Sequence, residues 1–313
     1  MNLRVLLWVV PYLMISTVQA QPLSSSDHQL ALTVGGFTRH YILHVPTSDS
    51  ADRMPLVMML HGAGGNASGA ARNYGWILKS DAEHFIVVFP QALPFDPTRP
   101  SNFLLNPNVW NDHRPDAAPR REIDDIAFLS AVIDDVQRQC HVDPNRIYIT
   151  GFSNGASMTF TLATQLSKRI AAIAPVSGHC WPNDVALAHP VPLMLIVGDA
   201  DPLNPLAGGL ANNPWGPPTT KPAMVDSITD WLRFNNETSA DVSTQSHGEV
   251  TTKTFAAQSA CPIVFITIAG QGHEWPGHRS VLPKTLTGNN ATTFDATTNI
   301  WNFLKDKSLK KGG

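Results

Sequence analysis

Cysteine, net charge and long apolar runs are all scarce in this chain of 313 residues. There are only three cysteines and no two are close in sequence, which argues against a metal site built on them. The formal net charge is −3 and no stretch is rich in lysine and arginine, so the surface does not suit nucleic acid. Outside the N-terminus, no apolar run approaches the roughly 20 residues that span a bilayer.

The N-terminus has the pattern of a secretory signal peptide. Arg4 precedes an apolar run over residues 5–15, and residues 18–20 (VQA) form a small-residue cleavage site. An uncleaved membrane anchor is the alternative, although the run is short for one. We expect a signal peptide over residues 1–20 and a single secreted domain over residues 21–313, extracellular or periplasmic, with no stable membrane insertion after cleavage.

Strand-like and helix-like segments alternate along the remaining chain. Strand patterns cover residues 55–60, 85–89, 146–150, 170–175, 192–197, 250–255 and 262–269, and residues 30–34 and 40–45 resemble a hairpin. Helical patterns cover residues 68–82, 123–140, 154–167, 223–234 and 293–304. This alternation predicts an α/β fold with a mostly parallel central sheet and helices on both faces.

Two long segments fit neither pattern. Residues 91–121 and 199–222 are rich in proline, asparagine and glycine, and each follows the C-terminal end of a predicted strand. Long irregular segments in a compact domain are usually functional, and ligands bind at the C-terminal ends of parallel strands. We therefore expect both segments to border a binding site.

A nucleophile motif occupies residues 151–155 (GFSNG), between a predicted strand and a predicted helix. The tight turn needs glycine at both ends, where a side chain would clash, and it strains Ser153 so that the hydroxyl stands above the sheet. The same turn directs the backbone N–H of Asn154 toward the space beside that hydroxyl. The motif in this context predicts Ser153 as a catalytic nucleophile.

A serine nucleophile needs a histidine base oriented by an acid, in the chain order serine, acid, histidine. Of twelve histidines, three follow the candidate acids, and His247 among them lies in a predicted hairpin turn. His273 follows the last apolar strand in a glycine-rich loop, which favours it as the base over the alternative, His278. Both Asp199 and Asp201 are candidate acids, and Asp201 lies further into its loop and nearer to His273.

The negative oxygen of a tetrahedral intermediate needs a second N–H donor besides Asn154. Residues 61–66 (HGAGGN) follow a predicted strand at the place where such folds supply this donor. Glycines there allow the backbone to approach a ligand closely. We predict the N–H of Ala63 as the donor, with Gly64 as the alternative.

These motifs occur together in one known family. The segments are residues 61–62 (HG), 110–112 (WND), 123–128 (IDDIAF), 142–146 (VDPNR), 151–158 (GFSNGASM), 198–201 (GDAD) and 272–277 (GHEWPG). Together they resemble secreted α/β-hydrolase esterases related to polyhydroxybutyrate depolymerases and feruloyl esterases. The resemblance implies an α/β-hydrolase fold and a triad of Ser153, Asp201 and His273, and it favours Asp201 over Asp199. It implies no metal and no organic cofactor.

The resemblance leaves the substrate open. Members act on polyester, on feruloylated or acetylated plant polysaccharide, or on simple aryl and short acyl esters, so an ester, small or polymeric, is the expected partner. Many relatives have a cysteine-containing loop after the Trp-Asn segment, whereas residues 111–121 are charged and rich in proline, and a polymer-binding module is not recognisable. Both departures weaken a claim to efficient attack on solid polymer.

Tryptophans add a prediction about the binding surface. Trp110, Trp181, Trp215 and Trp275 lie in loops at predicted C-terminal strand ends. Such rings can form an apolar wall for an acyl chain, and we predict Trp110, Trp181 and Trp275 as substrate-binding. The alternative is that they pack the loops together.

A carboxylic ester hydrolase is thus the leading interpretation of the whole sequence. A serine peptidase is the competing enzyme, and a non-catalytic surface-binding protein on a hydrolase scaffold is the competing class. Reaction with a fluorophosphonate separates the last from both enzymes, and a matched ester and amide separate the two enzymes.

Overall fold

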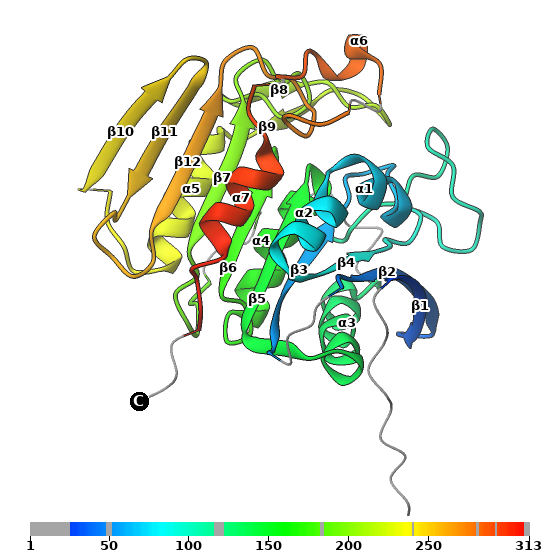
Figure 1. Cartoon of the computed structure of the whole chain (residues 1–313). Helices are drawn as coiled ribbons and strands as arrows, with labels where there is room; N and C mark the ends of the chain where they lie inside the picture. Colours follow the sequence, from blue (N-terminus) through cyan, green and yellow to red (C-terminus); the bar gives the residue numbers. More distant parts are fainter. Residues whose placement is uncertain are drawn as a thin grey trace, which may run out of the picture.

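The computed structural model describes residues 26–47, 52–115, 122–181, 185–239, 241–279, 282–291 and 293–309. The signal peptide predicted over residues 1–20 lies outside these ranges. The main strands are β1 (Ser26–Val34), β2 (Phe37–Val45), β3 (Met54–Leu60), β4 (Ile86–Pro90), β5 (Val142–Phe152), β6 (Ala172–Val176), β7 (Leu193–Gly198), β10 (Val242–His247), β11 (Val250–Phe255) and β12 (Ile263–Ile268). They form one ten-stranded sheet in the order β1-β2-β4-β3-β5-β6-β7-β12-β11-β10 (Figure 1).

The centre of the sheet is parallel and its two edges are antiparallel. Strands β4, β3, β5, β6, β7 and β12 pair in parallel, so their C-terminal ends meet along one edge. β1 and β2 extend one side of this centre, and β11 and β10 extend the other, all in antiparallel pairing. The predicted mostly parallel sheet is confirmed.

Helices cover both faces of the sheet (Figure 1). They are α1 (Ala67–Asn73), α2 (Trp76–Glu83), α3 (Asp125–Gln139), α4 (Asn154–Leu166), α5 (Met224–Phe234) and α7 (Ala296–Leu304). α3, α4 and α5 pack into one apolar core, while α1, α2 and α7 pack into the core on the opposite face. No helix within the described ranges is both long enough and apolar enough to cross a membrane.

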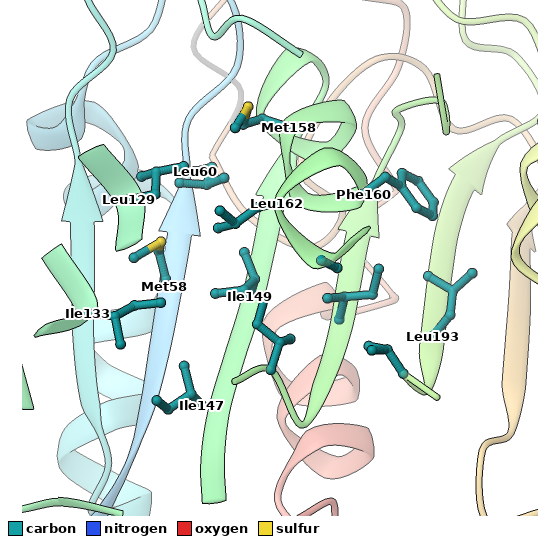
Figure 2. Packing of buried hydrophobic residues seen from close by; sticks show 14 of the residues in the cluster. Met58, Leu60, Leu129, Ile133, Ile147, Ile149, Met158, Phe160, Leu162 and Leu193 are labelled. Carbon is teal, nitrogen blue, oxygen red and sulfur yellow. The ribbon is translucent and has the colours of Figure 1, made fainter. Parts of the chain in front are cut away.

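The central strands feed both cores because successive side chains of a strand point to opposite faces. In β3, Met58 and Leu60 join the core under α3 and α4, whereas Val57 and Met59 join the opposite core. Figure 2 shows the first core, where Met58 and Leu60 lie close to side chains of α3 and α4. Two-sided burial explains why these strands read as continuous apolar runs.

The structure departs from the predicted elements in four places. The helix expected over residues 68–82 is two helices, because Gly75 takes a left-handed φ of 72° between α1 and α2. β10 has no counterpart among the predicted strands; all six of its residues are exposed, so the strand lacks the apolar alternation that marks a half-buried one. The segment over residues 199–222 contains a small hairpin of β8 (Gly209–Ala211) and β9 (Thr219–Lys221), and α6 (Lys284–Thr287) also lies in a stretch without a predicted helix.

Candidate active site

Ser153 occupies a strained turn between β5 and α4. Its φ of 55° and ψ of −119° are unusual for a residue with a side chain. A Cβ atom on Gly151 would lie 2.4 Å from the carbonyl oxygen of Gly155, and one on Gly155 would lie 2.3 Å from that of Leu60. Glycine at both positions is therefore required by backbone packing, which agrees with the steric argument made for this motif.

His273 connects Ser153 to Asp201. Its Nε2 lies 2.8 Å from Ser153 Oγ, and its Nδ1 lies 2.7 Å from Asp201 Oδ2. A carboxylate only accepts hydrogen bonds, so Nδ1 carries the ring proton and Nε2 presents its lone pair to the serine hydroxyl. The structure thus brings together the three residues predicted as a triad, from the ends of β5, β7 and β12.

The two oxygens of Asp201 have separate partners. Oδ1 accepts the backbone N–H groups of Leu203 at 2.9 Å and Asn204 at 2.8 Å, which leaves Oδ2 for His273. Asp199, the alternative acid, is exposed and accepts the N–H of Gly270. This bond ties the loop after β7 to the loop after β12, so Asp199 orders loops and does not contact His273.

The other candidate histidines lie in different surroundings. His278 Nε2 contacts Asp295 at 3.2 Å, and its ring packs where a side chain on Gly75 would otherwise stand. His247 lies in the exposed strand β10. Neither residue lines the cavity that contains Ser153.

The loop that carries His273 is held from both sides. The N–H of Gly272 donates to Asn289 O at 2.7 Å, and a Cβ on Gly272 would lie 2.1 Å from Thr287 O. Glu274 accepts the Thr287 hydroxyl at 2.6 Å, and burial raises the pKa of its carboxyl. The glycine-rich loop is therefore a packed support for His273.

The predicted oxyanion donors lie beside Ser153. Both Ala63 and Asn154 line the cavity, and Asn154 is the first residue of α4, where backbone N–H groups lack helical partners. The N–H of the alternative donor, Gly64, already donates to Asn108 O at 2.8 Å. Among the bonds of the described residues, none uses the N–H of Ala63. These contacts favour Ala63 over Gly64.

Hydrogen bonds to residues 110–112 fix the side chain of Asn154. Its Nδ2 donates to Trp110 O at 3.1 Å and to Asp112 Oδ2 at 2.9 Å, and its Oδ1 accepts the N–H of Trp110 at 2.7 Å. Burial raises the pKa of Asp112, while the nearby Arg114 acts in the opposite direction. Residues 110–112 therefore anchor Asn154, one of the two predicted oxyanion donors.

His61 anchors the loop that carries Ala63, the second predicted oxyanion donor. Its Nδ1 donates to Gly62 O at 2.8 Å, and its Nε2 accepts the N–H of Ala92 at 3.1 Å. Complete burial lowers the pKa of His61 to about 4, so the ring is neutral and holds the loop through both nitrogens. The indole of Trp110 completes the network by donating to His61 O at 2.8 Å.

Two of the tryptophans predicted to bind substrate do not line the cavity. Trp110 and Trp275 are each 1% exposed. The Trp110 indole donates to His61 O at 2.8 Å, and the Trp275 indole donates to Thr297 Oγ1 at 3.0 Å and stacks on Tyr74. The prediction is wrong for this pair, because their N–H groups and rings are used to pack loops. Trp181 and Trp215 do line the cavity.

A cavity of about 220 Å³ opens over Ser153, and the two segments without predicted structure form much of its wall. Trp215 packs edge-on against Phe103 at 5.5 Å between ring centres and donates to its carbonyl oxygen, which joins the two segments. The apolar lining comes from Phe95, Pro107, Val109, Leu203, Pro214 and Trp215. The ionisable lining comes from Asp112, Arg114, His179 and Lys221.

Comparison with known proteins decides the family. Residues 45–214, more than half of the chain, match the phospholipase/carboxylesterase family. The chain belongs to this family. The predicted resemblance to α/β-hydrolase esterases is thereby confirmed, and the chain is a carboxylic ester hydrolase.

The relatives of this esterase include proteins of several named activities. It is 30% identical over 264 residues to the putative esterase NocK of Nocardia uniformis subsp. tsuyamanensis, covering 79% of this chain and 73% of NocK. It is 26% identical to a probable feruloyl esterase C of Aspergillus terreus, covering 75% of this chain and 76% of that protein. A third relative is the poly(3-hydroxyalkanoate) depolymerase C of Paucimonas lemoignei, 31% identical over 43% of this chain but only 30% of its own length.

A solved structure supports the fold. The acetyl xylan esterase of Aspergillus awamori superimposes with a TM-score of 0.56 at 15% identity, covering 80% of this chain and 94% of that chain. At this identity the likeness bears on the fold alone, and it confirms the α/β-hydrolase architecture of this esterase.

His179 and the anchoring role of Asp112 were not recognised in the sequence. Both lie in loops at C-terminal strand ends of the sheet, which is the signal that could have found them. Among the described residues no group of three or more histidines, cysteines, aspartates and glutamates is placed to hold a metal ion.

Proposed function

We propose that this protein hydrolyses carboxylic esters through a Ser153–His273–Asp201 triad and a covalent acyl-enzyme. The observation that carries the proposal is the position of His273, within hydrogen-bond distance of Ser153 Oγ on one side and Asp201 Oδ2 on the other. Burial of His273 and Asp201 favours strong, well-directed bonds in this chain of groups.

The steps follow from the positions of these atoms. Ser153 Oγ attacks the ester carbonyl carbon while His273 Nε2 takes the hydroxyl proton. The N–H groups of Asn154 and Ala63 stabilise the negative oxygen of the tetrahedral intermediate. The C–O bond to the alcohol then breaks as His273 returns the proton to the leaving oxygen. Water repeats the sequence on the acyl-enzyme and releases the acid and free Ser153.

Asp201 keeps its charge throughout this cycle. It orients the imidazole and stabilises the imidazolium ion that forms when His273 takes the serine proton. The hydrogen bonds of His61, Trp110 and Asp112 fix Asn154 and the loop of Ala63 before substrate arrives. Donors that are already fixed need little rearrangement in the transition state.

For the substrate we propose an ester of the kind cleaved by feruloyl esterases and polyhydroxybutyrate depolymerases. The support is the set of relatives with these names and a cavity that pairs aromatic walls with polar groups. An acetylxylan or short-chain aryl ester is the second candidate, favoured by the limited cavity volume of about 220 Å³. We also propose secretion after removal of residues 1–20, for which the support is the N-terminal sequence pattern.

A side-by-side assay tests the proposal. Purified protein starting at Gln21 is given methyl ferulate, acetylated xylan and amorphous polyhydroxybutyrate, with Ser153→Ala as the blank. Clearing of the polyester supports a depolymerase, whereas release of ferulate or acetate without clearing supports an accessory esterase of plant polysaccharide. Hydrolysis that is equal in the Ser153→Ala protein, or no hydrolysis of any ester, would rule the proposed chemistry out.

A further inference from the structure

The segment after β6, residues 177–181, forms part of the wall of the cavity that contains Ser153. His179 and Trp181 of this segment both line the cavity that contains Ser153. The backbone N–H of His179 donates to Ser157 Oγ in α4 at 3.0 Å. Since α4 also begins directly after the nucleophile, this bond fixes the segment relative to Ser153.

The side-chain nitrogens of this wall, unlike its backbone N–H groups, lack well-formed hydrogen bonds to the described residues. Neither ring nitrogen of His179, nor the indole nitrogen of Trp181, makes a hydrogen bond within the described residues. His179 is only 1% exposed although it lines the cavity, so its ring has little contact with bulk solvent. Buried polar atoms are normally paired, and an unpaired one inside a binding cavity points to a group supplied by a ligand.

The chemistry of the two side chains defines that group. Burial lowers the pKa of His179 to about 4, and Lys221 adds to the effect, so the ring is neutral and offers one donor and one acceptor. The Trp181 indole offers one donor, and the two rings lie 5.0 Å apart. A hydroxyl group both donates and accepts, whereas a carboxylate only accepts and an ammonium group only donates. A hydroxyl can use the acceptor as well as the donors of this pair, which neither a carboxylate nor an ammonium group can do.

We propose that His179 and Trp181 form a hydroxyl-binding subsite in the cavity that contains Ser153, so that the preferred substrates carry a hydroxyl group on their acyl or alcohol part. This inference rests on the proposed function, because the subsite lies in the cavity of the proposed nucleophile. The hydroxyl has two sources among esters, a phenol on the acyl side or a sugar on the alcohol side.

Asn204 offers the competing explanation of His179. Its side chain lies in the same cavity wall, with its Nδ2 donating to Ser177 O at 2.7 Å. Burial lowers the pKa of His179 and a side-chain hydrogen bond with Asn204 opposes that shift, so this amide lies within reach of the ring. A well-formed bond between the two gives His179 a purely structural role. That role predicts equal damage to all substrates when His179 is replaced, whereas a hydroxyl subsite predicts selective damage.

Two matched ester pairs distinguish these roles and the two hydroxyl sources. Methyl 4-hydroxycinnamate and methyl cinnamate differ by a phenol on the acyl side. A monoacetylated methyl xyloside and cyclohexyl acetate differ by ring hydroxyls on the alcohol side. The readout is the ratio of kcat/KM within each pair, compared between wild type and variant so that intrinsic ester reactivity cancels.

His179→Leu should lower this ratio by roughly 10- to 100-fold in one pair, because the variant keeps the volume of the side chain but cannot bind the hydroxyl. His179→Gln, which retains a donor and an acceptor, should keep much of the ratio. Trp181→Phe should lower it by about 3- to 10-fold, since one donor is lost. His189→Leu, an exposed histidine outside the cavity, is the matched control and should leave both ratios unchanged.

The pair that responds identifies the source of the hydroxyl. The subsite is overturned if His179→Leu and Trp181→Phe leave both ratios within about twofold of wild type, or if both members of each pair fall equally. If His179→Leu does not fold, Trp181→Phe decides by itself. Failure of the proposed function gives a different result, since wild type would then neither cleave phenyl acetate nor react with a fluorophosphonate at Ser153.

Discussion

Two sides of the cavity differ in how completely their polar groups are paired. On the oxyanion side, His61, Trp110 and Asn154 use their ring and amide groups in hydrogen bonds with the protein. In the segment after β6, the ring nitrogens of His179 and Trp181 lack well-formed hydrogen bonds to the described residues. His61, Asn154 and His179 are all buried, so burial alone does not reveal the function of a polar residue. Paired groups hold the reacting geometry in place, and unpaired groups remain for the substrate.

Substitutions of Asp201 and Asp199 are expected to give the largest difference in kcat. In Asp201→Asn one oxygen still accepts the N–H groups of Leu203 and Asn204, and the new amide faces His273, where it favours the wrong tautomer. We expect kcat to fall by roughly 10³- to 10⁴-fold. Asp199→Asn keeps an oxygen for Gly270 and should change kcat by less than about threefold. Steady-state kinetics with an aryl acetate measure both, and a larger loss in Asp199→Asn would reverse the two roles.

Two tryptophan substitutions test the difference between paired and unpaired groups through the free energy of unfolding. Trp110→Phe leaves His61 O buried without its donor, which should lower the free energy of unfolding by about 2–4 kcal/mol. Trp181→Phe removes a donor that has no partner and should change it by less than about 1 kcal/mol. Urea denaturation of both variants and wild type gives the values. Equal losses would show that the two sides do not differ in pairing.

The smallest effect concerns the buried carboxyl of Asp112. Burial raises its pKa above the ordinary value for an aspartate, so the folded state binds this proton more tightly than the unfolded state. Its contribution to stability is present at acid pH and is lost as pH rises through the raised pKa. Asp112→Asn should therefore become more stable relative to wild type as pH increases from about 4 to 7. Asp199→Asn is the control, and parallel stability curves for Asp112→Asn and wild type would contradict the account.

Local rules suffice to predict the tight turn at Ser153 and the central sheet. The glycines at 151 and 155 follow from contacts within a few residues of the turn, and the two-sided apolar strands from burial on both faces. The predicted strand ends then place Ser153, Asp201 and His273 on one edge of the sheet. Such features depend on the sequence nearby, so periodicity and spacing are enough to predict them.

The loops depend on contacts distant in sequence. Trp110 and Trp275 occupy positions typical of a binding wall, and only the fold shows that their indoles donate to His61 O and Thr297 Oγ1. No local pattern separates them from Trp181 and Trp215, which do line the cavity. His179 escapes prediction for the same reason, since its distinction is the lack of a partner in three dimensions.

Fluorophosphonate labelling followed by peptide mass spectrometry tests the central claim most directly. The account predicts one adduct, on the peptide that contains Ser153, and no labelling of Ser153→Ala. It also predicts that kcat of Ser153→Ala on an aryl acetate falls by roughly 10⁴-fold or more while the far-UV circular dichroism is unchanged. An adduct on another residue, or near-normal turnover by Ser153→Ala, would contradict it.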